Sequence, residues 1–78
     1  MSAPMSQVEY DRIHVVNGMA YRMRDEFVSQ ATIDAQFDYK AARQAGIPWK
    51  VKEAAKRFED SRRADVQRAL TIIRGEAA

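Results

Sequence analysis

The side chains of this sequence that are best suited to binding chemistry are cations in its second half. Residues 40–74 hold ten lysines and arginines against four acids, whereas residues 1–39 hold three arginines against six acids. Clustered cations of this kind bind polyanions or an acidic protein surface. The candidate binding residues are one tryptophan and six of the cations that follow it: Trp49, Lys50, Lys52, Lys56, Arg57, Arg63 and Arg68.

Lysine and arginine neutralise phosphates and release counterions, which gives affinity without sequence recognition. An aromatic ring beside them can stack on a base or wedge between two bases. We nevertheless expect Trp49 to anchor the core at the start of a helix, and nucleic-acid contact is its alternative role. For the lysines, the alternative to binding is an ordinary solvated helix surface.

The sequence predicts no catalytic site, no metal site and no cofactor. Cysteine is absent and His14 is the one histidine, which excludes thiolate and multi-histidine zinc sites. The sequence contains neither a glycine-rich phosphate loop nor a nucleophile with a base at helical spacing. The adjacent acids of residues 25–26 and 59–60 point to different sides of a helix. We therefore expect a protein that is not an enzyme, with a structural His14.

The chain has 78 residues, enough for one small domain over residues 7–75 behind a flexible tail of residues 1–6. No apolar run approaches the roughly 20 residues of a membrane span, and the first residues lack a signal-peptide pattern. These features predict a cytoplasmic protein without a membrane partner. A core this thin favours gaining buried area by self-association, so we expect a homo-oligomer.

Spacing and breaker residues predict helices on both sides of residues 46–48. Thr32 suits an N-cap, Gly46 ends the first helix as a left-handed residue, and Pro48 suits the first turn of the next. The face expected to be buried in the first helix repeats every four residues: Ile33, Phe37, Ala41 and Ala45.

The last helix begins near Trp49 and reaches at least Phe58, and the absence of Gly and Pro from residues 49–73 favours its continuation. On a helical wheel it carries one apolar stripe: Val51, Ala54, Ala55, Phe58, Val66, Ala69, Ile72 and Ile73. The predicted binding cations flank this stripe on two edges. Arg62 falls inside the stripe, which requires either a helix break near Ser61 or an acidic partner for Arg62.

Residues 7–30 fit two structures. Apolar residues at steps of three and four favour a helix: Ile13, Val16, Ala20, Met23 and Phe27. Asn17-Gly18 between β-branched and alternating residues favours instead a hairpin with a type I′ turn. The predicted fold is therefore mainly α, with two to three helices, or alternatively a β-hairpin at residues 12–23 followed by two helices.

Residues 42–57, Ala-Arg-Gln-Ala-Gly-Ile-Pro-Trp-Lys-Val-Lys-Glu-Ala-Ala-Lys-Arg, resemble the middle of GapR-type nucleoid-associated proteins. The resemblance lies in an alanine, a short gap, a glycine, an apolar residue and a lysine-rich helix. It implies an oligomer that clamps DNA with Lys50, Lys52, Lys56 and Arg57. The same segment fits a sequence-specific helix-turn-helix less well, because Lys52 occupies an expected apolar position.

Two functions follow from these features. The first is a small oligomeric DNA-binding protein that contacts phosphates through a basic helix with little sequence specificity. The second is a small phage-type inhibitor or adaptor, similar to anti-CRISPR and other anti-defence proteins. Such a protein would use the same basic surface against an acidic site on a host protein.

Overall fold

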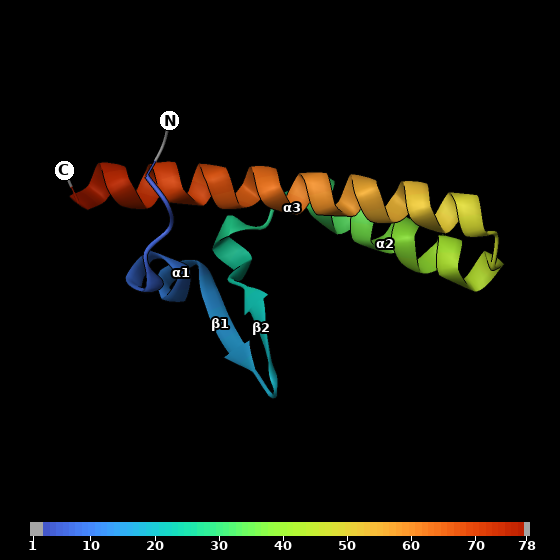
Figure 1. Ribbon diagram of the computed structural model, residues 1–78, viewed down its shortest axis with the longest axis horizontal. Coiled ribbons are helices and arrows are strands. Elements are labelled where there is room, and N and C mark those ends of the chain that lie inside the picture. Colours follow the sequence, from blue (N-terminus) through green and yellow to red (C-terminus); the bar gives the residue numbers. More distant parts are fainter. Residues whose placement is uncertain (1–2, 78) are drawn as a thin grey trace.

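The structure, a computed structural model, describes residues 3–77 of the chain. One long helix spans the molecule, and two smaller units pack on it one after the other (Figure 1). In chain order, the elements are α1 (Gln7–Ile13), β1 (His14–Asn17), β2 (Ala20–Met23), the 3-10 helix η1 (Asp25–Phe27), α2 (Gln30–Ala45) and α3 (Pro48–Ala77). The predicted mainly helical fold is confirmed, in the form that has an N-terminal β-hairpin.

Helix α3 begins where the sequence predicts. Pro48 is its first residue, a position at which the missing proline N–H is not needed. The carbonyl of Ile47 accepts the N–H groups of Lys50 and Val51, both at 3.1 Å. The helix continues without a break for 30 residues. The helix therefore does not break near Ser61. Within residues 3–77 Arg62 forms no ion pair either, and its guanidinium lies 5.7 Å from the centre of the Phe58 ring.

Helix α2 is capped one turn earlier than predicted. The N-cap is Ser29, whose hydroxyl accepts the N–H of Thr32 at 3.2 Å. Thr32 is therefore a buried residue of the first turn, and its prediction as the cap is wrong. At the other end Gly46 adopts φ 71° and donates its N–H to the Ala42 carbonyl, which confirms the predicted stop.

The buried face of α2 also differs from the prediction. Phe37, at the centre of the predicted face, is 64% exposed, whereas Thr32 and Ala35 are buried. The four-residue repeat marks one side of the helix, but small residues on another side let α2 lie close to α3. There Ala35 is buried on α2, Ala54 is buried on α3, and the Tyr39 and Phe58 rings lie 6.1 Å apart. Of the predicted face, Phe37, Ala41 and Ala45 are exposed and Ile33 is half-buried.

Of the two predicted structures for residues 7–30, the structure has the hairpin. Helix α1 ends at Ile13, and β1 and β2 pair antiparallel from His14 with Met23 to Asn17 with Ala20. The β-branched residues Val15 and Val16 favour this extended backbone. The continuous helix through residues 7–30 is therefore wrong, and the hairpin spans residues 14–23 rather than 12–23.

The turn of the hairpin is centred one residue later than expected. The register leaves Gly18 and Met19 as its two central residues. Gly18 has φ 66°, and no non-glycine residue within residues 3–77 has a positive φ. A positive φ at the first central position alone is typical of a type II′ turn, so the expected type I′ turn is wrong.

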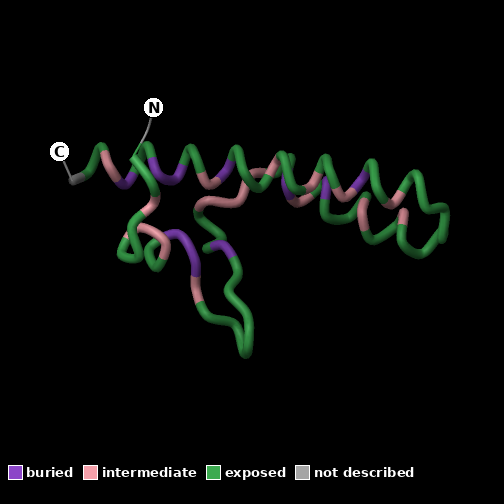
Figure 2. Tube along the Cα trace, in the orientation of Figure 1, coloured by how far each residue is buried: buried purple, intermediate pink, exposed green. Residues whose placement is uncertain are grey.

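The main core lies between the last turns of α3 and the N-terminal unit, which is formed by α1 and the β-hairpin. Buried residues are concentrated there, while much of the rest of the trace is exposed (Figure 2). The buried cluster joins α1, β2 and α3: Ile13, Met23, Ala69, Leu70 and Ile73. Met5 packs against it, so part of the predicted tail contacts the core, and residues 1 and 2 lie outside the described residues. Within residues 3–77 no helix has both the length and the apolar composition to cross a bilayer.

Candidate functional site

The predicted binding residues of α3 lie in two places along the helix. Arg63 and Arg68 lie past its middle. The other five occupy its first three turns, at the end of the molecule farthest from the β-hairpin (Figure 1): Trp49, Lys50, Lys52, Lys56 and Arg57. We call residues 40–57, where α2 and α3 meet, the helical tip.

The helical tip is strongly cationic. It holds six lysines and arginines against one acid, Glu53, and it includes all four lysines of the chain. The lysine side chains lie on exposed residues, and no carboxylate of residues 3–77 forms an ion pair with any of them. The ammonium groups of these lysines are therefore available for direct contact with an anion.

The arginines among the predicted residues differ from the lysines, because each is paired with an acid on α3. Arg57 lies 3.4 Å from Glu53, Arg63 lies 3.8 Å from Asp60, and Arg68 lies 2.7 Å from Asp65. The first two pairs are exposed, and exposed pairs hold their partners weakly. The third pair includes a buried carboxylate, so Arg68 has a structural role.

Trp49 is not a core anchor. Its residue is 64% exposed, which contradicts the expected burial. Two positions along a helix correspond to about 200° of rotation, so Trp49 points away from the side that carries half-buried Val51. The ammonium of Lys50 lies 5.6 Å from the centre of the indole ring. The helical tip therefore presents an aromatic ring to solvent among cations.

A shallow hollow of about 550 Å³ lies beside Trp49 on α3. Three of the residues that line it follow the helical spacing of one face, at positions 49, 52 and 56. Its lining residues are Trp49, Lys52, Glu53, Ala55, Lys56 and Glu59. The hollow thus has an aromatic residue at one end, two lysines along its length and an acid at the other end.

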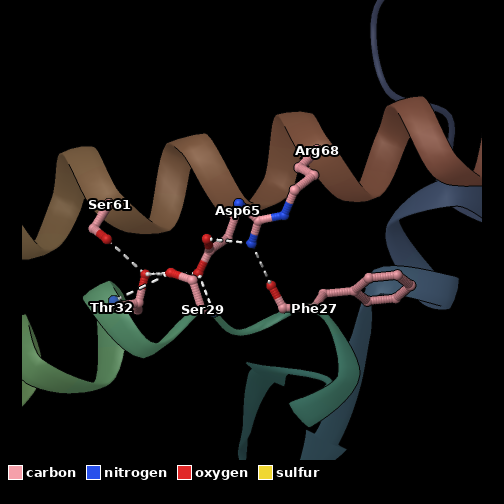
Figure 3. Close-up of polar contacts among 6 residues, drawn as sticks. All are labelled: Phe27, Ser29, Thr32, Ser61, Asp65 and Arg68. Atoms are coloured by element: carbon pink, nitrogen blue, oxygen red, sulfur yellow. Dashed lines mark hydrogen bonds and ion pairs between the residues drawn. The ribbon is translucent and has the colours of Figure 1, made fainter.

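The most buried charge of the chain lies elsewhere, between α2 and α3. Asp65 is 1% exposed, and its Oδ2 accepts the Ser29 N–H at 3.0 Å and the Thr32 hydroxyl at 2.6 Å. Its Oδ1 accepts Nη2 of Arg68 at 2.7 Å (Figure 3). The same nitrogen of Arg68 donates to the Phe27 carbonyl at 3.4 Å. These bonds tie the first turn of α2 to α3.

Burial alone would raise the pKa of Asp65, but the hydrogen bonds from Ser29, Thr32 and Arg68 outweigh it and lower the pKa. The carboxylate is therefore ionised and fully partnered, which suits a structural clamp. This cluster was not predicted from the sequence. The sequence feature that could have revealed it is Asp65, a single acid that falls within the apolar stripe of the last helix.

The ion pair of Arg74 with Glu9 joins the N-terminal unit to α3. Arg74 Nε donates to Glu9 Oε2 at 2.6 Å, and Arg74 Nη2 donates to the Ala3 carbonyl at 3.1 Å. Glu9 also completes a capping box with Ser6 at the start of α1. The hydrogen bond from Arg74 is the main reason that the pKa of Glu9 is lowered to about 2.

His14 has a structural environment. It is buried, its ring stacks on Tyr10 with 4.1 Å between centroids, and its Nδ1 lies 3.1 Å from the Tyr10 carbonyl. Among residues 3–77, no three side chains of the metal-ligating types come together.

The β-hairpin also carries exposed apolar residues. Val16 and Tyr21 pair with each other across the strands, on the same face as buried His14 and Met23. The face of the hairpin that is buried at His14 and Met23 is therefore exposed to solvent at Val16 and Tyr21. An open groove of about 500 Å³ separates β2 from the α2–α3 pair, and Tyr21 and Phe58 are among its lining residues.

Comparisons of the chain with protein-family models, with curated proteins and with solved structures find no match. The resemblance of residues 42–57 to GapR-type proteins therefore stays a prediction. The function has to be argued from the geometry of the helical tip.

Proposed function

We propose that this protein binds nucleic acid through the phosphates, using the helical tip and with little sequence specificity. The observation that carries the proposal is the set of lysines at positions 50, 52 and 56. They are exposed, form no ion pair within the described residues and follow an exposed tryptophan on the same helix.

Unpaired lysines are suited to phosphate contact. An ammonium group that has no protein partner is matched by counterions in solution, and a bound phosphate releases them. Lysine acts as a point charge, whereas base recognition commonly uses the flat fork of arginine. At the tip Arg57 lies 3.4 Å from Glu53 and Arg43 lies 5.7 Å from the centre of the Tyr39 ring, so each arginine already has a contact on the protein. The chemistry therefore favours backbone contacts over base recognition.

The test is the salt dependence of DNA binding by charge-reversed variants. Lys52→Glu combined with Lys56→Glu should weaken binding to all duplex sequences alike. Removing one lysine–phosphate interaction should reduce the slope of log affinity against log salt by roughly 0.9. The matched control is Arg22→Glu with Arg24→Glu, which makes the same change in net charge on and just after β2, away from the helical tip, and should bind more tightly than the lysine variant.

The proposal fails if the parent protein binds no nucleic acid at low salt. It also fails if the lysine double variant binds as the parent does. Circular dichroism of both double variants controls for loss of the fold.

The oligomer belongs to the same proposal. The exposed apolar residues of α2, with Phe37 at their centre, offer area for self-association that the monomer leaves in solvent. Light scattering at micromolar concentration should give a mass above the monomer value of 8.9 kDa. Phe37→Ser should return that mass to the monomer value, and a monomeric parent contradicts this part of the proposal.

A second candidate function is an inhibitor or adaptor that binds another protein. The exposed pair of Val16 and Tyr21, beside the groove next to β2, favours this candidate. A partner captured after nuclease treatment should be lost with Val16→Ser combined with Tyr21→Ser and kept by the lysine double variant. Loss with the lysine variant alone would assign the capture to the helical tip instead.

A further inference from the structure

The strip on α3 that begins at Trp49 has a directional order of groups. Lys52 and Lys56 follow Trp49 at steps of three and four residues, so the three side chains lie along one side of the helix. With a rise of about 1.5 Å per residue, Lys52 lies about 4.5 Å beyond Trp49, and Lys56 about 6 Å beyond Lys52. Backbone positions this far apart let the two lysine side chains reach two different phosphates of one strand.

An exposed indole ring distinguishes between forms of nucleic acid. In a duplex the base faces are already stacked on one another, so the ring reaches a face only after unstacking, which costs a few kcal/mol. In a single strand the base faces are free, and every base has one. The 64% exposure of Trp49 therefore matches an unpaired base better than a groove of B-form DNA.

We propose that this strip is a subsite for single-stranded nucleic acid. One unpaired base stacks on Trp49, and two phosphates of the same strand lie on Lys52 and Lys56. The inference rests on the proposed phosphate binding and adds the class of nucleic acid to it.

The acids at the strip limit its length. Glu53 is paired with Arg57 at 3.4 Å, so its charge is partly offset. Glu59 lies three residues beyond Lys56 and lines the far end of the hollow. A third phosphate in line would approach its carboxylate. The strip therefore accommodates a short stretch of strand.

An anionic membrane surface is a different partner that exposed tryptophan and lysine could contact. Membrane-surface helices bury a continuous apolar face in the headgroup region. The strip offers one large apolar side chain, Trp49, followed by Ala55 between lysines. The structure therefore favours a nucleic acid, and the membrane becomes an outcome of the test.

The test uses the fluorescence of Trp49, which is the one tryptophan of the chain. An oligothymidylate of about ten nucleotides, within the site sizes common for single-strand binding, should quench this fluorescence when added to the full-length protein at low salt. A duplex of equal length should not quench it at the same concentration. In anisotropy titrations with labelled oligonucleotides, Trp49→Leu should lower affinity for the single strand about tenfold or more. Affinity for the duplex should change by no more than about twofold, since the ring reaches no base face there.

A matched variant separates stacking from simple bulk. Trp49→Phe keeps an aromatic face and should recover part of the single-strand affinity that Trp49→Leu loses. If Phe and Leu lose affinity equally, Trp49 does not stack and the inference is wrong.

The outcomes also separate this inference from the proposed function. Equal affinity for single strand and duplex without quenching overturns the single-strand subsite and leaves phosphate binding in place. Binding that survives Lys52→Glu with Lys56→Glu overturns both. A blue shift with phosphatidylserine vesicles, together with no response to oligonucleotides, overturns both in favour of a membrane surface.

Discussion

The two halves of α3 treat charge in opposite ways. Along the second half, Asp65 on α3 and Glu9 on α1 are engaged by arginines of α3 and by backbone groups. At the helical tip, the lysines have no acidic partner within the described residues. Both halves belong to one unbroken helix of 30 residues. The carboxylates that hold the fold together have partners, whereas the lysines gathered at the helical tip are available for binding.

The strongest test of this contrast is to remove one acid in each half of α3. Asp65→Ala leaves Arg68, the Thr32 hydroxyl and the Ser29 N–H without their buried acceptor, which should cost about 3 kcal/mol of unfolding free energy. Glu53→Ala at the tip removes an exposed partner and should cost at most about 0.5 kcal/mol. Urea denaturation measures both, and equal losses would erase the contrast.

Low pH should lower the stability of the fold, because it protonates Glu9 and Asp65. The pKa of Glu9 falls from 4.5 to about 2 on folding, so its ion pair stabilises the fold fully above pH 4.5 and loses its effect as the pH falls towards 2. The lowered pKa of Asp65 acts in the same direction. The urea midpoint should therefore drop across this range.

Glu9→Gln provides the control for this pH dependence. The variant lacks the titrating carboxylate and should be less stable at neutral pH, with a shallower drop in acid. A drop as steep as that of the parent would show that other carboxylates cause it.

Two glycines, one in the hairpin turn and one in α3, should respond in opposite directions to replacement by alanine. Gly18→Ala should destabilise the fold by about 1 kcal/mol, because φ 66° at the turn strains any residue with a Cβ. Gly75→Ala should stabilise α3 by up to about 1 kcal/mol, because a Cβ there meets no atom within 4 Å. Melting shifts of opposite sign are expected, and a stabilised Gly18→Ala would contradict the hairpin.

The smallest expected effect is at the helical tip. Lys52→Glu with Lys56→Glu should change the unfolding free energy by no more than about 0.5 kcal/mol, because both residues are exposed and unpaired among residues 3–77. A loss as large as that of Gly18→Ala would mean that these lysines help to hold the fold.

Backbone chemistry was the most predictable part of this molecule. Gly46 and Pro48 mark the end of α2 and the start of α3, because a left-handed stop and a missing N–H have few alternatives. The cationic cluster was also visible, since charge can be counted along a sequence. The exposure of Trp49 was not, because a tryptophan beside a proline fits a core as well as a surface.

The remaining errors arose where two solutions were close in energy. A helix through residues 7–30 would place Gly18 in its interior at a cost of about 1 kcal/mol, which is too little to exclude it from local sequence alone. On α2, the apolar repeat around Phe37 predicts one buried face, whereas the hydrogen bond of Thr32 to Asp65 accompanies burial of another. These two residues are 33 positions apart in the sequence, and a local repeat carries no information about contacts at that separation.

The position of the chain ends has a practical consequence. Arg74 bonds the carbonyl of Ala3, and Arg12 bonds Glu76, so both ends of the described chain lie at the end of α3 opposite the helical tip (Figure 1). The molecule is 46 Å along its longest axis. A fluorescent protein, an affinity tag or a sensor-chip linker fused at either end would point the lysines and Trp49 outward, so immobilised protein should remain open to its ligand.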